Sequence, residues 1–318
     1  MATNRSEHLN EVLEIHKMSH VNDLLDKYRE KRKEIKEALE EKYKEKIYSP
    51  INSGSYAKHT AINIKFDLDL VVPFKKDSFS TLEEMFDDVF NFILKEYGSK
   101  ANVRKQTVSI GIEFYEDDDG DIINIDIVPG RELNKDQYDE DKKLNLYVNS
   151  IYGNIKEKTH LLTNINAQIN HIKSKENERK IIRLLKIWKT TNKEKYKSFF
   201  LELITIKAFD KEDISGNLWE KLKSVMEYIK ENIAKEEFKL KDPGNSGNDV
   251  ADTLESWEKD NLSSKMKNMI ERIESNSDNI KIYFPVNKDF KDEEEGKKYG
   301  VKEGGSTFSI PSRDQRFG

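Results

Sequence analysis

The stretch Gly54-Ser55-Tyr56-Ala57-Lys58-His59-Thr60-Ala61-Ile62, continued by Asp67-Leu68-Asp69-Leu70-Val71-Val72-Pro73, decides the fold of this chain. It begins with a Gly-Ser turn that can hold phosphate, and the next residues can form one or two helical turns. A run rich in β-branched residues follows and is typical of a strand. Two aspartates two residues apart on a strand leave the same face. A phosphate-binding turn therefore comes just before a pair of acids.

A third aspartate, Asp126, lies in a second predicted strand over residues 121–128. The isoleucines at alternate positions of that strand would point to one face and Asp126 to the other. If the strands pair, Asp67, Asp69 and Asp126 converge. Each like-charge pair at about 4 Å costs on the order of 4 kcal/mol at an effective dielectric of about 20, so protonation or divalent metal must relieve it. Oxygen ligands beside phosphate suit two Mg²⁺ or Mn²⁺ ions, which can bind the attacking and leaving oxygens of an in-line displacement.

Gly54 and Ser55 supply the complementary half of such a site. Glycine lets the backbone approach a phosphate closely, and Ser55 offers a hydroxyl and an N–H where a helix begins. Each signal alone has an ordinary alternative, because solvated acids and Gly-Ser dipeptides are common in loops. The order of turn, acid doublet and third acid among apolar neighbours favours a phosphate-transfer site, since buried acids need a partner or a metal.

The composition excludes several classes of protein. Hydrophobic and charged residues are each 36% of the 318 residues, and 55 basic against 60 acidic residues give a net charge of −5. This balance argues against disorder and against a dedicated nucleic-acid binder. With no cysteine, no disulfide or thiolate metal site is expected. The polar N-terminus and the lack of a long apolar run predict no signal peptide, no membrane span and a cytoplasmic protein.

The pattern along the chain predicts an α+β fold with two lobes. We divide it into a long N-terminal helix packed on both lobes (1–48), a mixed α/β core (49–146), a helical lobe (147–288) and a mobile, charged, glycine-containing tail (289–318). Alternating charges over residues 27–46 favour a solvated helix face over a basic face for nucleic acid.

Individual elements follow from the same patterns. The core lobe is expected to contain strands over 64–72, ended by Pro73, over 103–115 and over 121–128, and a helix over 80–97. The helical lobe is expected to contain helices over 159–174, 177–191, 197–209, 218–234 and 250–275. The acidic run Asp117-Asp118-Asp119-Gly120 predicts a hairpin turn; a calcium loop would need a spacing and a final glutamate that are missing.

Gly54-Ser55, Asp67-Leu-Asp69 and Asp126 in this order make the chain similar to the polymerase-β-type nucleotidyltransferases. More narrowly, the chain resembles the cGAS/DncV-like nucleotidyltransferases (CD-NTases) of bacterial antiphage (CBASS) signalling. The narrower likeness is carried by segments 54–62, 67–69, 126–129, 183–189, 198–203 and 242–248, and it spans roughly residues 10–285.

The resemblance implies a bilobal polymerase-β-like fold and an enzyme that joins nucleoside triphosphates, such as ATP and GTP, with release of pyrophosphate. The product would be a cyclic di- or trinucleotide second messenger in antiviral defence. The implied catalytic residues and ligands of two Mg²⁺ or Mn²⁺ ions are Asp67, Asp69 and Asp126, the last of which would help deprotonate the acceptor hydroxyl. The implied nucleotide-binding residues are Gly54, Ser55, Lys186 and Ser198.

Alternatives remain at this point. Lys186 could be a solvent-reaching helix lysine and Ser198 a helix N-cap, and Glu202 is interpreted as structural in preference to base-contacting. The same chemistry could extend RNA or make linear oligonucleotides, and the fold could serve as a non-catalytic nucleotide sensor. A monomer is expected, with no membrane and no nucleic-acid partner. The terminal Gly318 could be joined to a target by an accompanying ubiquitin-type ligase.

Overall fold

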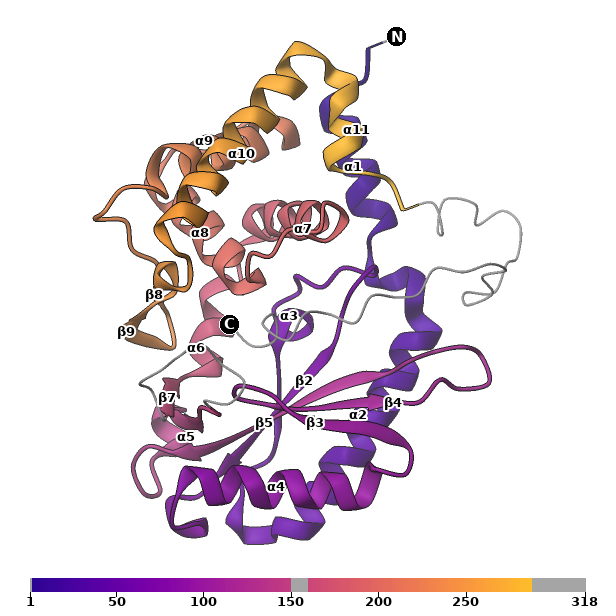
Figure 1. The fold of residues 1–318 in the computed structure, drawn as a ribbon, viewed down its shortest axis with the longest axis vertical. Helices are drawn as coiled ribbons and strands as arrows, with labels where there is room; N and C mark the ends of the chain where they lie inside the picture. The colour runs from indigo at the N-terminus through magenta and orange to yellow at the C-terminus, as the bar shows by residue number, and fades with distance from the viewer. Residues whose placement is uncertain (1, 150–159, 288–318) are drawn as a thin grey trace.

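The computed structural model describes residues 2–149 and 160–287. A sheet with helices packed against it forms one lobe, and a group of helices forms the other (Figure 1). The bilobal α+β fold expected from the sequence is confirmed.

The strands and helices have the following bounds. The strands are β1 (Ile51–Ser53), β2 (Leu68–Phe74), β3 (Ala101–Lys105), β4 (Ile110–Phe114), β5 (Asn124–Glu132), β6 (Leu144–Tyr147), β7 (His160–Thr163), β8 (Lys241–Asp242) and β9 (Asn245–Asp249). The helices are α1 (Arg5–Ile15), α2 (Asn22–Tyr43), α3 (Gly54–Ala57), α4 (Leu82–Tyr97), α5 (Tyr138–Asp141), α6 (Ile165–Ile172), α7 (Glu176–Thr191), α8 (Ser198–Lys211), α9 (Leu218–Asn232), α10 (Ser256–Ser275) and α11 (Ile280–Tyr283).

Strands β2 and β5 form the centre of the main sheet and run parallel to each other. The strand order is β1-β2-β5-β4-β3, and β6 and β7 extend the sheet from the C-terminal end of β5. Every residue of β2 is buried. Its nearly continuous apolar run follows from this position, because a strand covered on both faces has no solvated side.

Helices α2 and α4 cover one face of the sheet. Ile35 of α2 and Phe86 of α4 belong to one buried cluster with Ile125 of β5. The opposite face carries a smaller cluster that includes Val71 and Val128. The predicted alternation of β5 is confirmed, since its isoleucines and Val128 lie in different clusters.

The N-terminal segment braces both lobes, as predicted. Leu9 of α1 lies in the core of the helical lobe, whereas α2 packs on the sheet (Figure 1). The segment is helical from Arg5 to Lys46 but is interrupted after Ile15. The amide Nδ2 of Asn63 donates to the carbonyl of Ile15 at 2.8 Å, and its backbone N–H donates to that of His16 at 3.2 Å. Contacts with a distant residue therefore satisfy carbonyls at the end of α1, and no proline or glycine is needed for the break.

Three sequence predictions in the core and the following segment were wrong in detail. Strand β2 continues through Pro73, whose carbonyl accepts from the N–H of Tyr48, so the proline does not end it. The strand expected over 103–115 is two antiparallel strands, β3 and β4. The helix expected over 159–174 is α6 preceded by β7, because residues 160–163 pair with β6. Pairing with other parts of the sheet determines the secondary structure of these segments. A local sequence pattern carries no information about that pairing.

The proposed division at 48, 146 and 288 remains our interpretation, and the tail over 289–318, with Gly318, lies outside the described residues. Within residues 2–149 and 160–287, no helix combines the length and apolar character needed to cross a membrane.

Candidate active site

Asp69 and Asp126 are neighbours on the central strands. The register of β2 and β5 pairs Asp69 with Asp126, so their side chains leave the same face of the sheet. Both are buried, with exposed fractions of 8% and 1%. Asp67 lies one residue before β2 begins, two positions from Asp69. The structure therefore brings together the three acids that the sequence singled out.

The three carboxylates repel one another. Burial raises the pKa of Asp69 well above its ordinary value, and the nearby charges of Asp67 and Asp126 raise it further. Lys58 and Lys186 oppose this rise without cancelling it. A buried carboxyl that resists ionisation next to two others is a group that a divalent cation would stabilise. The oxygen donors of these acids therefore fit Mg²⁺ or Mn²⁺.

The Gly54 turn rests directly on this acid pair. Ser53 of β1 pairs with Asp69, and Gly54 follows with φ = +68°. A Cβ atom at residue 54 would lie 1.7 Å from Oδ2 of Asp69, which no side chain allows. Glycine is thus required both for the backbone conformation and for the close approach. Ser55, the next residue, is half-buried in the first turn of α3.

Asp126 is held by a residue that the sequence analysis missed. The amide Nε2 of Gln106, in the turn between β3 and β4, donates to Oδ1 of Asp126 at 3.1 Å. The hydroxyl of Ser109 in turn donates to Gln106 at 2.9 Å. This turn was expected to be continuous strand, so no signal in the sequence pointed to it.

Lys186 of α7 reaches the loop that follows the Gly54 turn and α3. Its side chain is buried, and Nζ donates to the carbonyl of Thr60 at 2.8 Å. Burial lowers the pKa of Lys186 to about 8, although the charges of Glu202, Asp67 and Asp69 oppose that change. The side chain points toward the acids and does not reach into solvent.

Lys189 is a second buried lysine, which we had not singled out. Its Nζ donates to the hydroxyl of Ser198 at 3.1 Å, at the first residue of α8. Burial lowers the pKa of Lys189 to about 7, and the charges of Lys65 and Lys186 act in the same direction. Ser198 is not the N-cap of α8, because that position is held by Lys197. Two lysines and a hydroxyl from the helical lobe therefore lie near the acids, and Asp67 acts on both lysines. The signal for Lys189 was its place one turn after Lys186.

A buried ion pair joins the lobes beside these groups. Nζ of Lys58, directly after α3, lies 2.9 Å from Oε1 of Glu202 on α8. The same Nζ lies 4.4 Å from the centre of the Phe199 ring. Glu202 thus has a structural partner, in agreement with its interpretation from the sequence.

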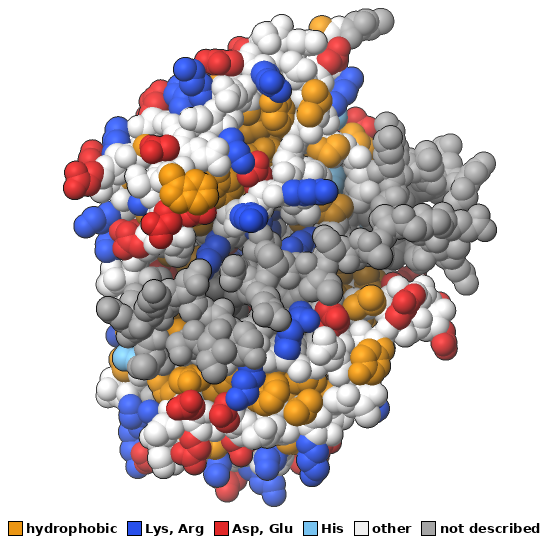
Figure 2. Space-filling model, viewed as in Figure 1, with side chains coloured by type: hydrophobic (Ala, Val, Ile, Leu, Met, Phe, Trp, Pro, Cys, Tyr) orange, Lys and Arg blue, Asp and Glu red, His pale blue; other side chains and the backbone are white. Residues whose placement is uncertain are grey.

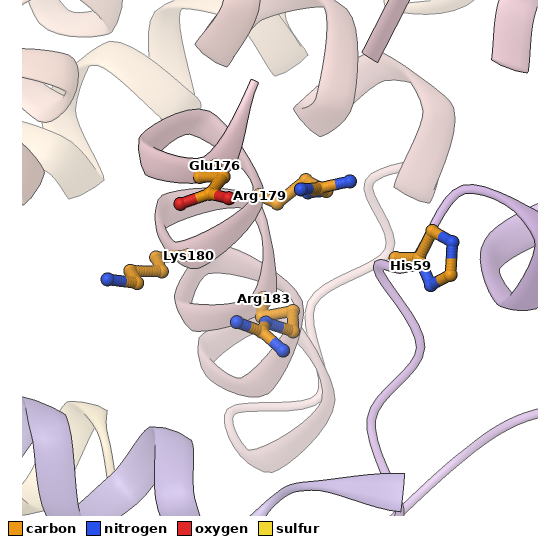
Figure 3. Close-up of a pocket in the computed structure, with 5 residues that line it drawn as sticks. All are labelled: His59, Glu176, Arg179, Lys180 and Arg183. Atoms are coloured by element: carbon orange, nitrogen blue, oxygen red, sulfur yellow. The ribbon is translucent and has the colours of Figure 1, made fainter. Parts of the chain in front are cut away.

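A basic pocket of about 350 Å³ lies nearer the N-terminal end of α7 than Lys186 does. Figure 3 shows Arg179 and Arg183 on this helix, with His59 opposite them on the loop after α3; Glu176 and Lys180 complete the lining. The two arginines precede Lys186 by seven and three residues, so they share its side of the helix. Figure 2 shows Lys and Arg side chains over much of this face of the molecule, several of them near its middle. The chemistry of the region suits a phosphate-bearing substrate.

Comparison with known families identifies the N-terminal part of the chain. Residues 6–145 match the family model described as Second Messenger Oligonucleotide or Dinucleotide Synthetase domain. The CBASS oligonucleotide cyclase CdnC of Escherichia coli (strain KTE188) is 26% identical over 214 residues, which are 64% of this chain and 64% of that protein. The match therefore spans less than two thirds of the relative's length.

Solved structures extend the likeness to most of the fold. Escherichia coli MS115-1 CdnC with ATP has a TM-score of 0.66 at 21% identity, covering 88% of this chain and 93% of that one. The Bradyrhizobium diazoefficiens CD-NTase CdnG in complex with GTP has a TM-score of 0.68 at 15% identity, covering 89% and 95%. At these identities the structures establish the fold. Similarity to the synthetase domain is thus carried by residues 6–145, and similarity in fold to these solved structures extends over most of the chain.

Proposed function

We propose that this protein is a metal-dependent nucleotidyltransferase that joins nucleoside triphosphates, releases pyrophosphate and closes the product into a cyclic di- or trinucleotide. The observation that carries the proposal is the register of Asp69 with Asp126 beneath the Gly54 turn. Buried acids that repel one another, next to a turn with no side chain, suit metal-bound triphosphate better than any structural role.

The residues divide into two groups. Asp67, Asp69 and Asp126 would hold two Mg²⁺ or Mn²⁺ ions, which stabilise charge on the attacking and leaving oxygens. Asp126, oriented by Gln106, would also take the proton of the acceptor hydroxyl. The second group, which would bind the donor triphosphate and then the pyrophosphate, comprises Gly54, Ser55, Lys186, Lys189 and Ser198.

The relatives suggest a biological setting. CdnC carries the description of a CBASS oligonucleotide cyclase, and a structure of it with a HORMA protein is known. We propose that this chain likewise makes a second messenger in cytoplasmic antiphage defence, with accessory CBASS proteins as partners. Conjugation of Gly318 and a monomeric state belong to this proposal as well.

Product analysis tests the proposal. Wild-type protein is incubated with all four labelled NTPs and Mg²⁺ or Mn²⁺, and phosphatase-resistant products are identified by mass spectrometry. We expect a cyclic product from the wild type and none from the Asp67→Ala/Asp69→Ala double variant. Linear products, or extension of an added RNA primer, would contradict cyclisation. Either result would support the alternative, an enzyme that makes linear oligonucleotides or extends RNA. Folded wild type that makes no product, with or without accessory proteins, would favour a nucleotide sensor.

A further inference from the structure

We propose that Lys58 and Glu202 form a positioning pair that holds the Gly54–Ser55 turn against the first turn of α8, so that both lobes grip one triphosphate. This inference rests on the proposed function, because it concerns the same nucleotide site. The pair connects residues 144 positions apart and is 2.9 Å long.

The location of the pair is its first support. Lys58 directly follows α3, the helix that begins with Gly54 and Ser55, and its N–H donates to the carbonyl of Gly54 at 3.3 Å. Glu202 lies one helical turn after Ser198 on α8. Each member of the pair is therefore fixed to one of the two elements that would bind the triphosphate, and a shift of either residue moves its element.

The burial of the pair is the second support. The two side chains are 8% and 6% exposed, so both charges have lost most of their hydration. A buried ion pair is weak in stabilising a fold, because desolvation offsets the attraction, and apolar replacements of similar volume are often no less stable. A charged pair at this place is better explained by the geometry it imposes, and contact with the Phe199 ring restricts Lys58 further.

The electrostatics of the site supply the third support. Lys58 lies close enough to Asp69 to lower the pKa of that carboxyl. Glu202 opposes the fall in the pKa of Lys186. With Glu202 in place, the Lys58 ammonium is paired with a carboxylate of α8 and does not neutralise Asp69. Loss of the Glu202 charge would leave Lys58 free to approach the acid that should bind metal.

The test separates positioning from stability. Lys58→Met, Glu202→Gln and the double variant Lys58→Met/Glu202→Leu are compared with wild type by thermal unfolding, by kcat and KM for NTP, and by the affinity for a non-hydrolysable ATP analogue with Mg²⁺. We expect the single variants to lose about 100-fold in kcat/KM, the loss that a misplacement of about 1 Å can cause. The apolar double variant should regain the wild-type melting temperature but not the activity or the analogue affinity.

Two further variants sharpen the result. Lys58→Arg keeps the charge and should retain most of the activity. Lys175→Met/Asp210→Asn removes an ion pair of 3.0 Å within the helical lobe, between the residue before α7 and a residue of α8, and should leave kcat/KM unchanged. Wild-type activity in the apolar double variant would overturn the positioning role.

Failure of the proposed function would look different. A wild type that binds the analogue but makes no product contradicts the synthase proposal, while the analogue affinities of the variants still test the pair. A wild type that neither binds nor turns over NTP would overturn both.

Discussion

Two acid clusters in the core lobe have the same composition and opposite surroundings. Asp117, Asp119 and Asp121 lie on the exposed hairpin turn, with carboxylate oxygens within 4.8 Å of one another. Asp69 and Asp126 lie on two buried strands, with Asp67 just before the first of them, and the three are spread more widely. By spacing alone, the hairpin looks like the better metal site.

The counter-charges reverse that impression. Nζ of Lys27 lies 2.7, 2.8 and 2.6 Å from the carboxylates of Asp117, Asp119 and Asp121. This lysine lowers the pKa of Asp117, whereas burial and like charges raise that of Asp69. The hairpin is a satisfied ion-pair network, and the strand cluster still requires positive charge. Distance between acids is therefore a poorer guide to a metal site than the cations that already face them.

Activity should separate the two clusters most strongly. Asp69→Asn keeps the size of the side chain but removes a charge from the reaction centre, and we expect a loss of about 10²–10³-fold or more in the rate of NTP turnover. The hairpin variant Asp117→Asn/Asp119→Asn/Asp121→Asn should keep the wild-type rate. Rates are measured as pyrophosphate release at saturating Mg²⁺.

The outcome that would break this comparison is an active Asp69→Asn variant together with an inactive hairpin variant. That result would place the essential cation at the hairpin and would also mean that Lys27 leaves it on metal binding.

Part of the strand cluster was predictable, because alternation along a strand fixes which residues share a face. Asp69 and Asp126 could each be assigned to a face in this way, but their convergence was inferred only on the condition that the two strands pair, as β2 and β5 do. The Lys58–Glu202 pair could not be predicted, because its partners are 144 residues apart. Gln106 was missed since its turn depends on the pairing of β3 with β4. What remained unpredictable were contacts between elements, and these contacts complete the site.

A smaller effect is expected at the lysines that face the strand cluster. Lys189→Met removes a charge-assisted contact to the triphosphate, worth about 1.5–3 kcal/mol, so KM for NTP should rise roughly 10- to 100-fold with a smaller change in kcat. Because the pKa of Lys189 is about 7 and that of Lys186 about 8, wild-type kcat/KM should fall as pH rises above this range and these lysines lose their protons.

The pH profile of the variant is the control. Its falling limb should move toward the pKa of Lys186, because one of the two titrating groups is gone. An unchanged KM and an unchanged profile would remove Lys189 from the nucleotide site.

Stability should give the smallest difference, and its sign should be opposite in the two clusters. The pKa of Asp69 is raised in the folded protein, so its stabilising contribution is present at low pH and is lost as pH rises through the folded-state value. Asp69→Asn should therefore melt at a higher temperature than the metal-free wild type at pH 8. Addition of Mg²⁺ should reduce this difference in melting temperature.

At the hairpin, the lowered pKa of Asp117 makes its contribution present near neutral pH and lost as pH falls through the folded-state value. Lys27→Met should lower the melting temperature by about 1–3 °C at pH 7, because exposed pairs contribute up to about 1 kcal/mol each. The effect should shrink on acidification and in high salt, which screens exposed charges. Thermal scans of both variants from about pH 4 to about pH 8 measure how the melting temperature changes with pH for each cluster. Slopes of the same sign would mean that the two clusters are electrostatically alike, and the distinction between a satisfied network and a cation-requiring site would then fail.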